Sequence, residues 1–167
     1  MTLTLDVDDR GAVLSDCGRY RYSLWRTWNG GDAYVNFVAL NPSTADETKD
    51  DATIRKLRAF AKCWGFGRMC VTNLFALRAT DPREMKAHAS PVGDENDAWL
   101  HRIASGASKV VLCWGTHGTH QGRSDKVLAY LREIVPGKLL HLSTTKGGQP
   151  GHPLYLPTYT EPKEWIP

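Results

Sequence analysis

An amide and two hydroxyls follow an apolar stretch at residues 33–40, in a corner whose backbone has little freedom. The corner reads Asn41-Pro42-Ser43-Thr44. Pro42 keeps Asn41 out of the helical region, because the proline ring clashes there with the preceding residue. Side chains fixed in this way are suited to orienting a water molecule or binding a ligand. Asp46 is the carboxylate nearest to the corner; it is a candidate general base if its side chain points inward, and otherwise a helix-capping or solvated residue.

A second amide, Asn73, interrupts the apolar run Val71-Thr72-Asn73-Leu74-Phe75. An asparagine amide offers both hydrogen-bond donors and an acceptor, and all of them need partners when the residue is buried. This pattern suits the edge of a nucleobase such as uracil, so Asn73 is a candidate for base recognition. The alternative is an asparagine that satisfies backbone groups at the end of a strand.

Two further polar groups contain threonine, lysine and histidine side chains. Thr116 follows Trp114-Gly115, and a Gly-rich stretch leads from Lys146 to His152-Pro153. Thr116 and Lys146 are candidates for binding phosphate. His152 is held between a glycine and a proline, and it is either a catalytic group or a structural histidine of the loop.

Signatures of a bound cofactor or metal do not occur in the sequence. There is no Walker A motif and no dinucleotide-binding fingerprint, and the four cysteines form no CxxC pair. His117 and His120 have no carboxylate at ligand spacing. We therefore expect neither a metal nor a cofactor. A G-x-S-x-G elbow is also missing, which argues against an α/β-hydrolase.

Apolar stretches alternate with helical patterns along most of the chain. Buried strands are predicted at residues 33–40, 68–76, 109–114 and 138–142. Helices are predicted at residues 51–64, about 82–88, 94–107 and 123–135. Two more strands, at 11–15 and 20–28, precede them, and the turn signal Asn29-Gly30-Gly31-Asp32 predicts that residues 20–40 form an antiparallel hairpin.

This alternation predicts a single α/β domain over residues 1–167. The expected architecture is a three-layer α/β/α sandwich with a mainly parallel, four-stranded central sheet, which an N-terminal antiparallel hairpin at about 11–40 extends. The carboxyl ends of parallel strands share one edge of the sheet, and ligands bind at that edge. We therefore expect the four polar groups to converge there.

Composition limits the choice of partner only weakly. The net charge is +3, and the basic residues are spread along the chain. Such a charge permits a polyanionic partner without demanding one. No apolar run approaches the roughly 20 residues of a membrane span. The first nine residues have no basic start and no apolar core of a signal peptide, so we expect a cytoplasmic protein.

The motifs resemble those of the DUF1643 family. The shared stretches are Leu40-Asn41-Pro42-Ser43-Thr44-Ala45-Asp46, residues 72–80 (TNLFALRAT), Val111-Leu112-Cys113-Trp114-Gly115 and residues 152–156 (HPLYL). Their order is also distantly similar to that of the uracil-DNA glycosylase superfamily. In that superfamily an Asp-Pro or Asn-Pro loop, a base-reading asparagine, a Trp-Gly pair and a His-Pro motif follow successive strands.

The second resemblance implies an N-glycosylase that removes a damaged or modified base from DNA, and it implies three groups of residues. The catalytic group is Asn41, which orients water, with His152 and Asp46. The base-binding group is Asn73, Pro42 and Phe75. The phosphate-binding group is Ser43, Thr44, Thr116 and Lys146. No metal or other cofactor is implied, and the partner is DNA or a nucleotide.

Other functions stay open on the sequence alone. The most active members of the superfamily have an aspartate where this chain has Asn41. An amide cannot accept a proton from water, which favours a nucleic-acid or nucleotide-binding module without turnover. The modest net charge also suits a hydrolase or transferase that acts on a free modified nucleotide. A fourth possibility is that the polar strand ends serve only stability.

Overall fold

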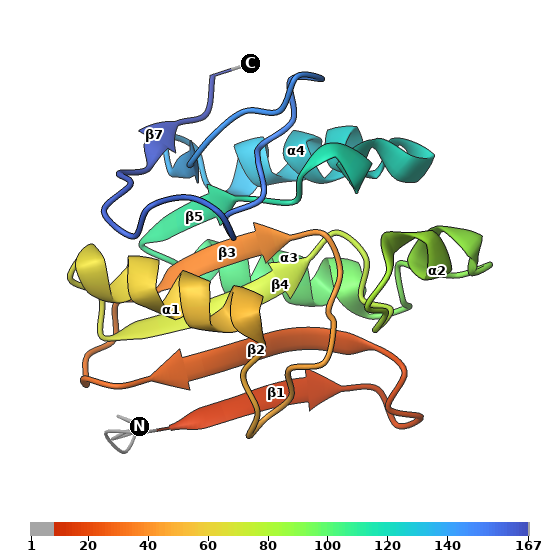
Figure 1. The fold of residues 1–167 in the computed structure, drawn as a ribbon, viewed down its shortest axis with the longest axis horizontal. Coiled ribbons are helices and arrows are strands. Elements are labelled where there is room, and N and C mark those ends of the chain that lie inside the picture. Colours follow the sequence, from red (N-terminus) through yellow and green to blue (C-terminus); the bar gives the residue numbers. More distant parts are fainter. Residues whose placement is uncertain (1–8, 167) are drawn as a thin grey trace.

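The computed structural model describes residues 9–166 as an α/β fold around one mixed sheet of seven strands (Figure 1). The strands are β1 (Arg10–Leu14), β2 (Arg21–Thr27), β3 (Val35–Ala39), β4 (Arg68–Asn73), β5 (Lys109–Leu112), β6 (Leu139–His141) and β7 (Lys163–Glu164). Their order across the sheet is β1-β2-β4-β3-β5-β6-β7. The helices are α1 (Ala52–Cys63), α2 (Pro82–Ala87), α3 (Asn96–Gly106), α4 (Arg123–Ile134) and a 3₁₀ helix (Thr116–Gly122).

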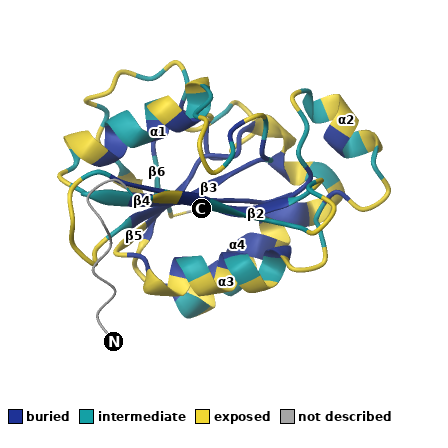
Figure 2. Cartoon of the chain, turned by 90° about the horizontal axis from the view of Figure 1, so that it is seen from below, coloured by how far each residue is buried: buried dark blue, intermediate teal, exposed yellow. Residues whose placement is uncertain are grey.

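The helices cover both faces of the sheet, as the predicted three-layer sandwich requires. Helix α1 lies on one face, and α3 and α4 lie on the other (Figure 2). Strand β3 supplies side chains to both cores, because successive residues of a strand point to opposite faces. Phe37 packs with the residues of α1, whereas Val38 packs with those of α3 and α4.

Helix α1 shows how closely local chemistry fixes the elements. Asp51 caps its first turn by accepting a hydrogen bond from the backbone N–H of Ile54. The helix stops before Gly65, whose φ of +84° is costly for other residues. All four predicted helices are present, and their ends differ from the predicted ones by at most two residues.

The four predicted core strands are adjacent and parallel, in the order β4-β3-β5-β6. The predicted hairpin over residues 20–40 is wrong. Strand β2 pairs antiparallel with β1 and β4, and β4 separates it from β3. The segment after β2 crosses the start of β4 instead of turning back, and the backbone N–H groups of Trp28 and Asn29 both donate to Gly67 O.

The reason for this order is burial. Strands β3 and β4 are buried on both faces and are most stable as central neighbours. The true N-terminal hairpin consists of β1 and β2. Strand β7, which the proline-rich tail did not predict, pairs antiparallel with β6 and makes the sheet larger than expected.

No helix within residues 9–166 is long and apolar enough to cross a membrane. Residues 1–8, on which the expectation of no signal peptide rests, lie outside the described residues.

Candidate functional site

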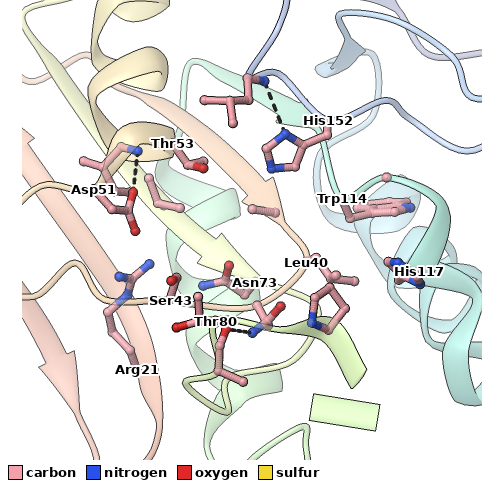
Figure 3. A pocket seen from close by; sticks show the side chains of 18 of the residues that line it. Arg21, Leu40, Ser43, Asp51, Thr53, Asn73, Thr80, Trp114, His117 and His152 are labelled. Atoms are coloured by element: carbon pink, nitrogen blue, oxygen red, sulfur yellow. Dashed lines mark hydrogen bonds between the residues drawn. The ribbon is translucent and has the colours of Figure 1, made fainter. Parts of the chain in front are cut away.

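A pocket of about 470 Å³ opens at the carboxyl ends of the parallel strands (Figure 3). This is the edge at which the sequence predicts a site. Five of the predicted residues line it, namely Asn41, Ser43, Asn73, Thr116 and His152. In Figure 3, Arg21 and Asp51 lie on one side, Trp114 and His152 lie on the other, and Asn73 lies between them.

Asn41 follows β3, and its amide nitrogen is fully engaged by the backbone. Nδ2 donates to the carbonyl oxygens of Ala79 at 2.9 Å and Pro42 at 3.1 Å, with a longer contact to Leu77 O. The side chain therefore ties the loop after β3 to the loop after β4. No hydrogen bond in the described chain engages Oδ1, which leaves that oxygen available as an acceptor.

Asn73 ends β4 and has the opposite arrangement. The residue is 1% exposed, and its Nδ2 has no hydrogen-bond partner. Its backbone carbonyl accepts from Asn96 Nδ2 at 2.9 Å. The next carbonyl, of Leu74, accepts from Arg123 Nε at 2.7 Å. Neighbouring side chains thus fix the backbone, while the Asn73 amide remains unpartnered at the pocket. A buried unpartnered amide is unfavourable unless a ligand or water completes it.

His152 reaches the pocket because the long loop before it folds back on itself. Thr145 N–H donates to Gln149 O, and Gly151 N–H donates to Ser143 O at 2.8 Å. A Cβ at Gly151 would lie 2.0 Å from Ser143 Oγ, so a larger residue here would require the Ser143 hydroxyl to rotate away. The loop is then tied to the end of β5, where Gly115 N–H donates to Pro150 O at 2.8 Å.

The orientation of the His152 ring is set by its own loop. Nδ1 accepts from the backbone N–H of Leu154 at 3.2 Å, so the neutral ring carries its proton on Nε2. Desolvation by the surrounding loops lowers the pKa of His152 below its ordinary value, although part of the ring remains open to solvent. The neutral form with an Nε2 donor is therefore the form present at neutral pH.

Trp114 makes the wall between the strand ends and His152. The indole Nε1 donates to Gln149 Oε1 at 2.9 Å. Gly118 packs so closely on the ring that a Cβ would lie 2.2 Å from Trp114 Cδ1. The side chain is 1% exposed, so this wall is rigid.

Arg21 and Asp51 line the opposite wall, and neither of them is among the residues predicted for the site. Asp51 has the sequence pattern of a helix cap, which gives no sign of a second role. Strict alternation along β2 would place Arg21 on the opposite face from Leu24. The register of β1 and β2 shifts opposite Arg21 and Ser23, and a bulge of this kind re-aims the side chains beside it. Arg21 Nη1 consequently reaches Ala45 O at 2.7 Å.

The chain was compared with models of known protein families. The DUF1643 model, described as a protein of unknown function, matches residues 21–154. The chain belongs to the DUF1643 family. The matched range begins at Arg21 and ends at Leu154, which are the first and last residues of the pocket lining. No curated protein and no solved structure matches the chain.

Five of the predicted site residues do not line the pocket of this DUF1643 protein, and packing or exposure accounts for each. Pro42 is buried, and Phe75 is 0% exposed in the core beneath α3 and α4. Thr44 is exposed, and Lys146 lies in the exposed turn between Thr145 and Gly148. The sequence cannot separate such residues from their neighbours in the same motifs.

Asp46 is the fifth of these residues, and its carboxylate is occupied locally. Oδ1 accepts from the backbone N–H groups of Thr48 and Lys49 and from the Thr48 hydroxyl. The backbone hydrogen bonds lower the pKa of Asp46, which makes it a weaker base. Asp51 is thus the carboxylate at the pocket, and its Oδ1 accepts from Ile54 N–H.

The pocket combines amides, one carboxylate, one guanidinium and two histidines, and this set fits a polar organic ligand better than a metal. Within residues 9–166 there is no group of three or more His, Cys, Asp or Glu residues that could hold a metal ion. The pocket volume lies within the usual range for small-molecule sites.

Proposed function

We propose that this protein recognises a damaged or modified nucleobase in cytoplasmic DNA and hydrolyses its N-glycosidic bond. The single observation that carries the proposal is Asn73, whose buried amide is unpartnered in the pocket that also holds His152. An amide and an imidazole N–H together match the donors and acceptors on the edge of a pyrimidine or purine. The order of motifs, which is similar to that of the uracil-DNA glycosylase superfamily, supports the same proposal. It also leads us to propose a fold of the glycosylase type.

In the proposed reaction, negative charge develops on the base, close to the hydrogen-bond donors of the pocket. The C1′–N bond breaks, and its electron pair stays on the base, which leaves as an anion. His152 Nε2–H donates a hydrogen bond to the carbonyl oxygen of the base as that charge develops. Asn73 holds the base out of the stack by pairing with its edge.

Water completes the reaction. Its oxygen bonds to C1′ of the oxocarbenium-like sugar, and its proton passes to a carboxylate. We assign that carboxylate to Asp51, because Asp51 lines the pocket whereas Asp46 does not. Asn41 Oδ1 accepts a hydrogen bond from the same water and orients it, since the amide itself cannot take the proton.

The test uses oligonucleotides that contain uracil, hypoxanthine or a modified pyrimidine, followed by alkaline cleavage of abasic sites. We expect strand scission with at least one base. Asp51→Asn keeps the helix cap and should lower the rate by roughly 10²–10⁴-fold. Asp46→Asn is the matched control and should retain the wild-type rate. Scission with none of the bases would refute the proposal, and an equal loss in both variants would refute the role of Asp51.

A second candidate is a hydrolase or transferase for a free modified nucleotide. The specific observation in its favour is Arg21, a cation buried in the wall of the pocket rather than spread over a DNA-binding surface. The dependence of binding on salt distinguishes the two substrates. Binding of a duplex weakens steeply with salt through counterion release, whereas binding of one nucleotide changes little.

A third candidate is a binding module without turnover, which Asn41 favours because it is an amide with its Nδ2 fully engaged. Binding of an oligonucleotide that survives Asp51→Asn and gives no product in either protein would select it.

A further inference from the structure

Three arginines are almost fully buried in the described chain, and only two of them form ion pairs. Arg26 pairs with Asp50 at 2.8 Å, and Arg123 pairs with Asp97. Arg21 is 2% exposed and forms no ion pair within residues 9–166. Buried charges in proteins are normally paired, because desolvation of an unpaired charge is costly. The missing partner of Arg21 therefore needs an explanation.

The hydrogen bonds of Arg21 are also incomplete. Nη1 donates to Ala45 O, but Nε is buried and has no partner. Burial lowers the pKa of Arg21 to about 10, so the guanidinium is still protonated at neutral pH. A guanidinium fork binds carboxylate or phosphate oxygens in pairs. Arg21 lines the pocket and so has a donor available toward it.

Two hydroxyls lie on the same side of the pocket. Ser43 and Thr53 both line it, and no hydrogen bond within the described residues engages either side chain (Figure 3). Thr53 is in the first turn of α1, at the positive end of the helix dipole. Asp51 is the acidic group that faces this region, and its charge raises the pKa of Arg21 without forming an ion pair.

We propose that this end of the pocket is an anion subsite in which Arg21, Ser43 and Thr53 bind a phosphate group of the ligand. The inference rests on the proposed function only in taking the ligand to be a nucleotide. The phosphate belongs either to a nucleotide monoester or to the backbone of a strand. It supplies the partner that Arg21 lacks, and the far end of the pocket, at His152, is left for the base.

The first test measures binding without turnover. The probes are inorganic phosphate, deoxyuridine, deoxyuridine 5′-monophosphate and a single-stranded trinucleotide with a central deoxyuridine. We expect the monophosphate or the trinucleotide to bind at least about tenfold more tightly than the nucleoside. A preference for the monophosphate identifies the monoester as the source, and a preference for the trinucleotide identifies the backbone. Equal binding of nucleoside and both phosphorylated probes overturns the subsite.

Variants assign the effect to Arg21. Arg21→Gln should remove the advantage of the phosphorylated probes, and Arg21→Lys should keep only part of it, because lysine lacks the fork. Arg102→Gln removes one exposed positive charge from α3 and should change nothing. Asp51→Asn should strengthen phosphate binding, because it removes the opposing charge. An Arg21→Gln protein that binds phosphate as the wild type does would overturn the proposal.

A measurement on the wild-type protein tests the subsite even if the Arg21 variants fail to fold. The ¹H–¹⁵N signal of Arg21 Nε should shift on titration with inorganic phosphate, and it should not shift with an equal concentration of chloride. An unchanged signal at saturating phosphate counts against the subsite. Because none of these measurements requires base release, the subsite can fail while the glycosylase proposal stands, and the reverse also holds.

Discussion

The ends of β3 and β4 lie side by side in the sheet, and each places an asparagine in the pocket, but the two amides are used differently. Asn41 Nδ2 donates hydrogen bonds to backbone carbonyl oxygens of its own loop and of the neighbouring loop. Asn73 Nδ2 donates to no acceptor within residues 9–166. The carbonyl oxygens at that strand end accept hydrogen bonds from Asn96 and Arg123 instead. One asparagine holds the loops of the pocket together, and the amide nitrogen of the other is unpartnered in the described chain.

A side chain that remains unpartnered at a strand end requires other residues to satisfy the backbone there. A loop must satisfy its buried carbonyls. At the end of β3 the site residue does so itself, and only its oxygen remains available. At the end of β4 helices α3 and α4 do so, through Asn96 and Arg123. The two helices therefore support the pocket through the backbone at the end of β4.

The largest effect that this comparison predicts is on Arg123. Arg123→Met removes one of the two donors to the carbonyl of Leu74, the other being Asn96 Nδ2, and breaks the ion pair with Asp97. We expect a loss of about 2–4 kcal/mol in the free energy of unfolding, measured with urea. Lys126→Met removes a mostly exposed partner of the same aspartate and should cost less than about 1 kcal/mol. Similar losses in the two variants would contradict the supporting role of Arg123.

A smaller loss of stability is expected at Asn41. Asn41→Ala removes the donor to Ala79 O and Pro42 O and should cost about 1–3 kcal/mol. Asn41→Asp should cost at least as much, because a carboxylate faces the same carbonyl oxygens. This outcome differs from what the glycosylase resemblance alone suggests, since aspartate is the residue of its most active members. Urea unfolding of both variants measures it, and an Asn41→Asp protein as stable as the wild type would show that the amide is not structural.

The architecture follows from the sequence to the extent that it depends on local pattern. The periods of apolar residues predict every α-helix and the four parallel strands, and strand-end chemistry predicts that Asn41, Asn73 and His152 lie in one region. The order of the strands depends on which faces are covered, and a turn signal such as Asn29-Gly30-Gly31-Asp32 does not encode that. The hairpin prediction failed for this reason.

Arg21 and Asp51, on one side of the pocket, were not predicted as site residues for a different reason. Arg21 reaches the site through a shift in strand register, which no period of two contains. Asp51 has the sequence signature of a cap and also lines the pocket, so its second role is hidden by the first. Phe75 shows the converse: its motif suggests a base contact, but its position just after β4, in the core beneath α3 and α4, buries it completely.

Asn73 should show the opposite balance from Asn41. Asn73→Leu replaces a buried unpartnered amide by an apolar side chain of similar size, so the free energy of unfolding should change by less than about 1 kcal/mol. Binding of the cognate nucleotide should weaken at least about tenfold, because the edge of the base loses its partners. Calorimetry and urea unfolding on the same sample measure both. A loss in the free energy of unfolding as large as in Asn41→Ala would mean that the Asn73 side chain is also structural.

The smallest effect concerns the pH dependence of His152. Desolvation lowers the pKa of His152 in the folded protein, so protonation favours the unfolded chain. The stability contributed by the neutral ring is therefore complete above the ordinary value of about 6.5 and is lost as the pH falls through the folded pKa. Protonation also places a hydrogen on Nδ1, which then cannot accept from Leu154 N–H. We expect an NMR titration of the ring to give a midpoint below 6.5 and ligand binding to weaken over the same range. In His152→Gln the weakening should disappear. A midpoint above 6.5 would mean that the ring is charged in the pocket, and His152 would then resemble the cationic end, at Arg21, rather than the neutral amides between them.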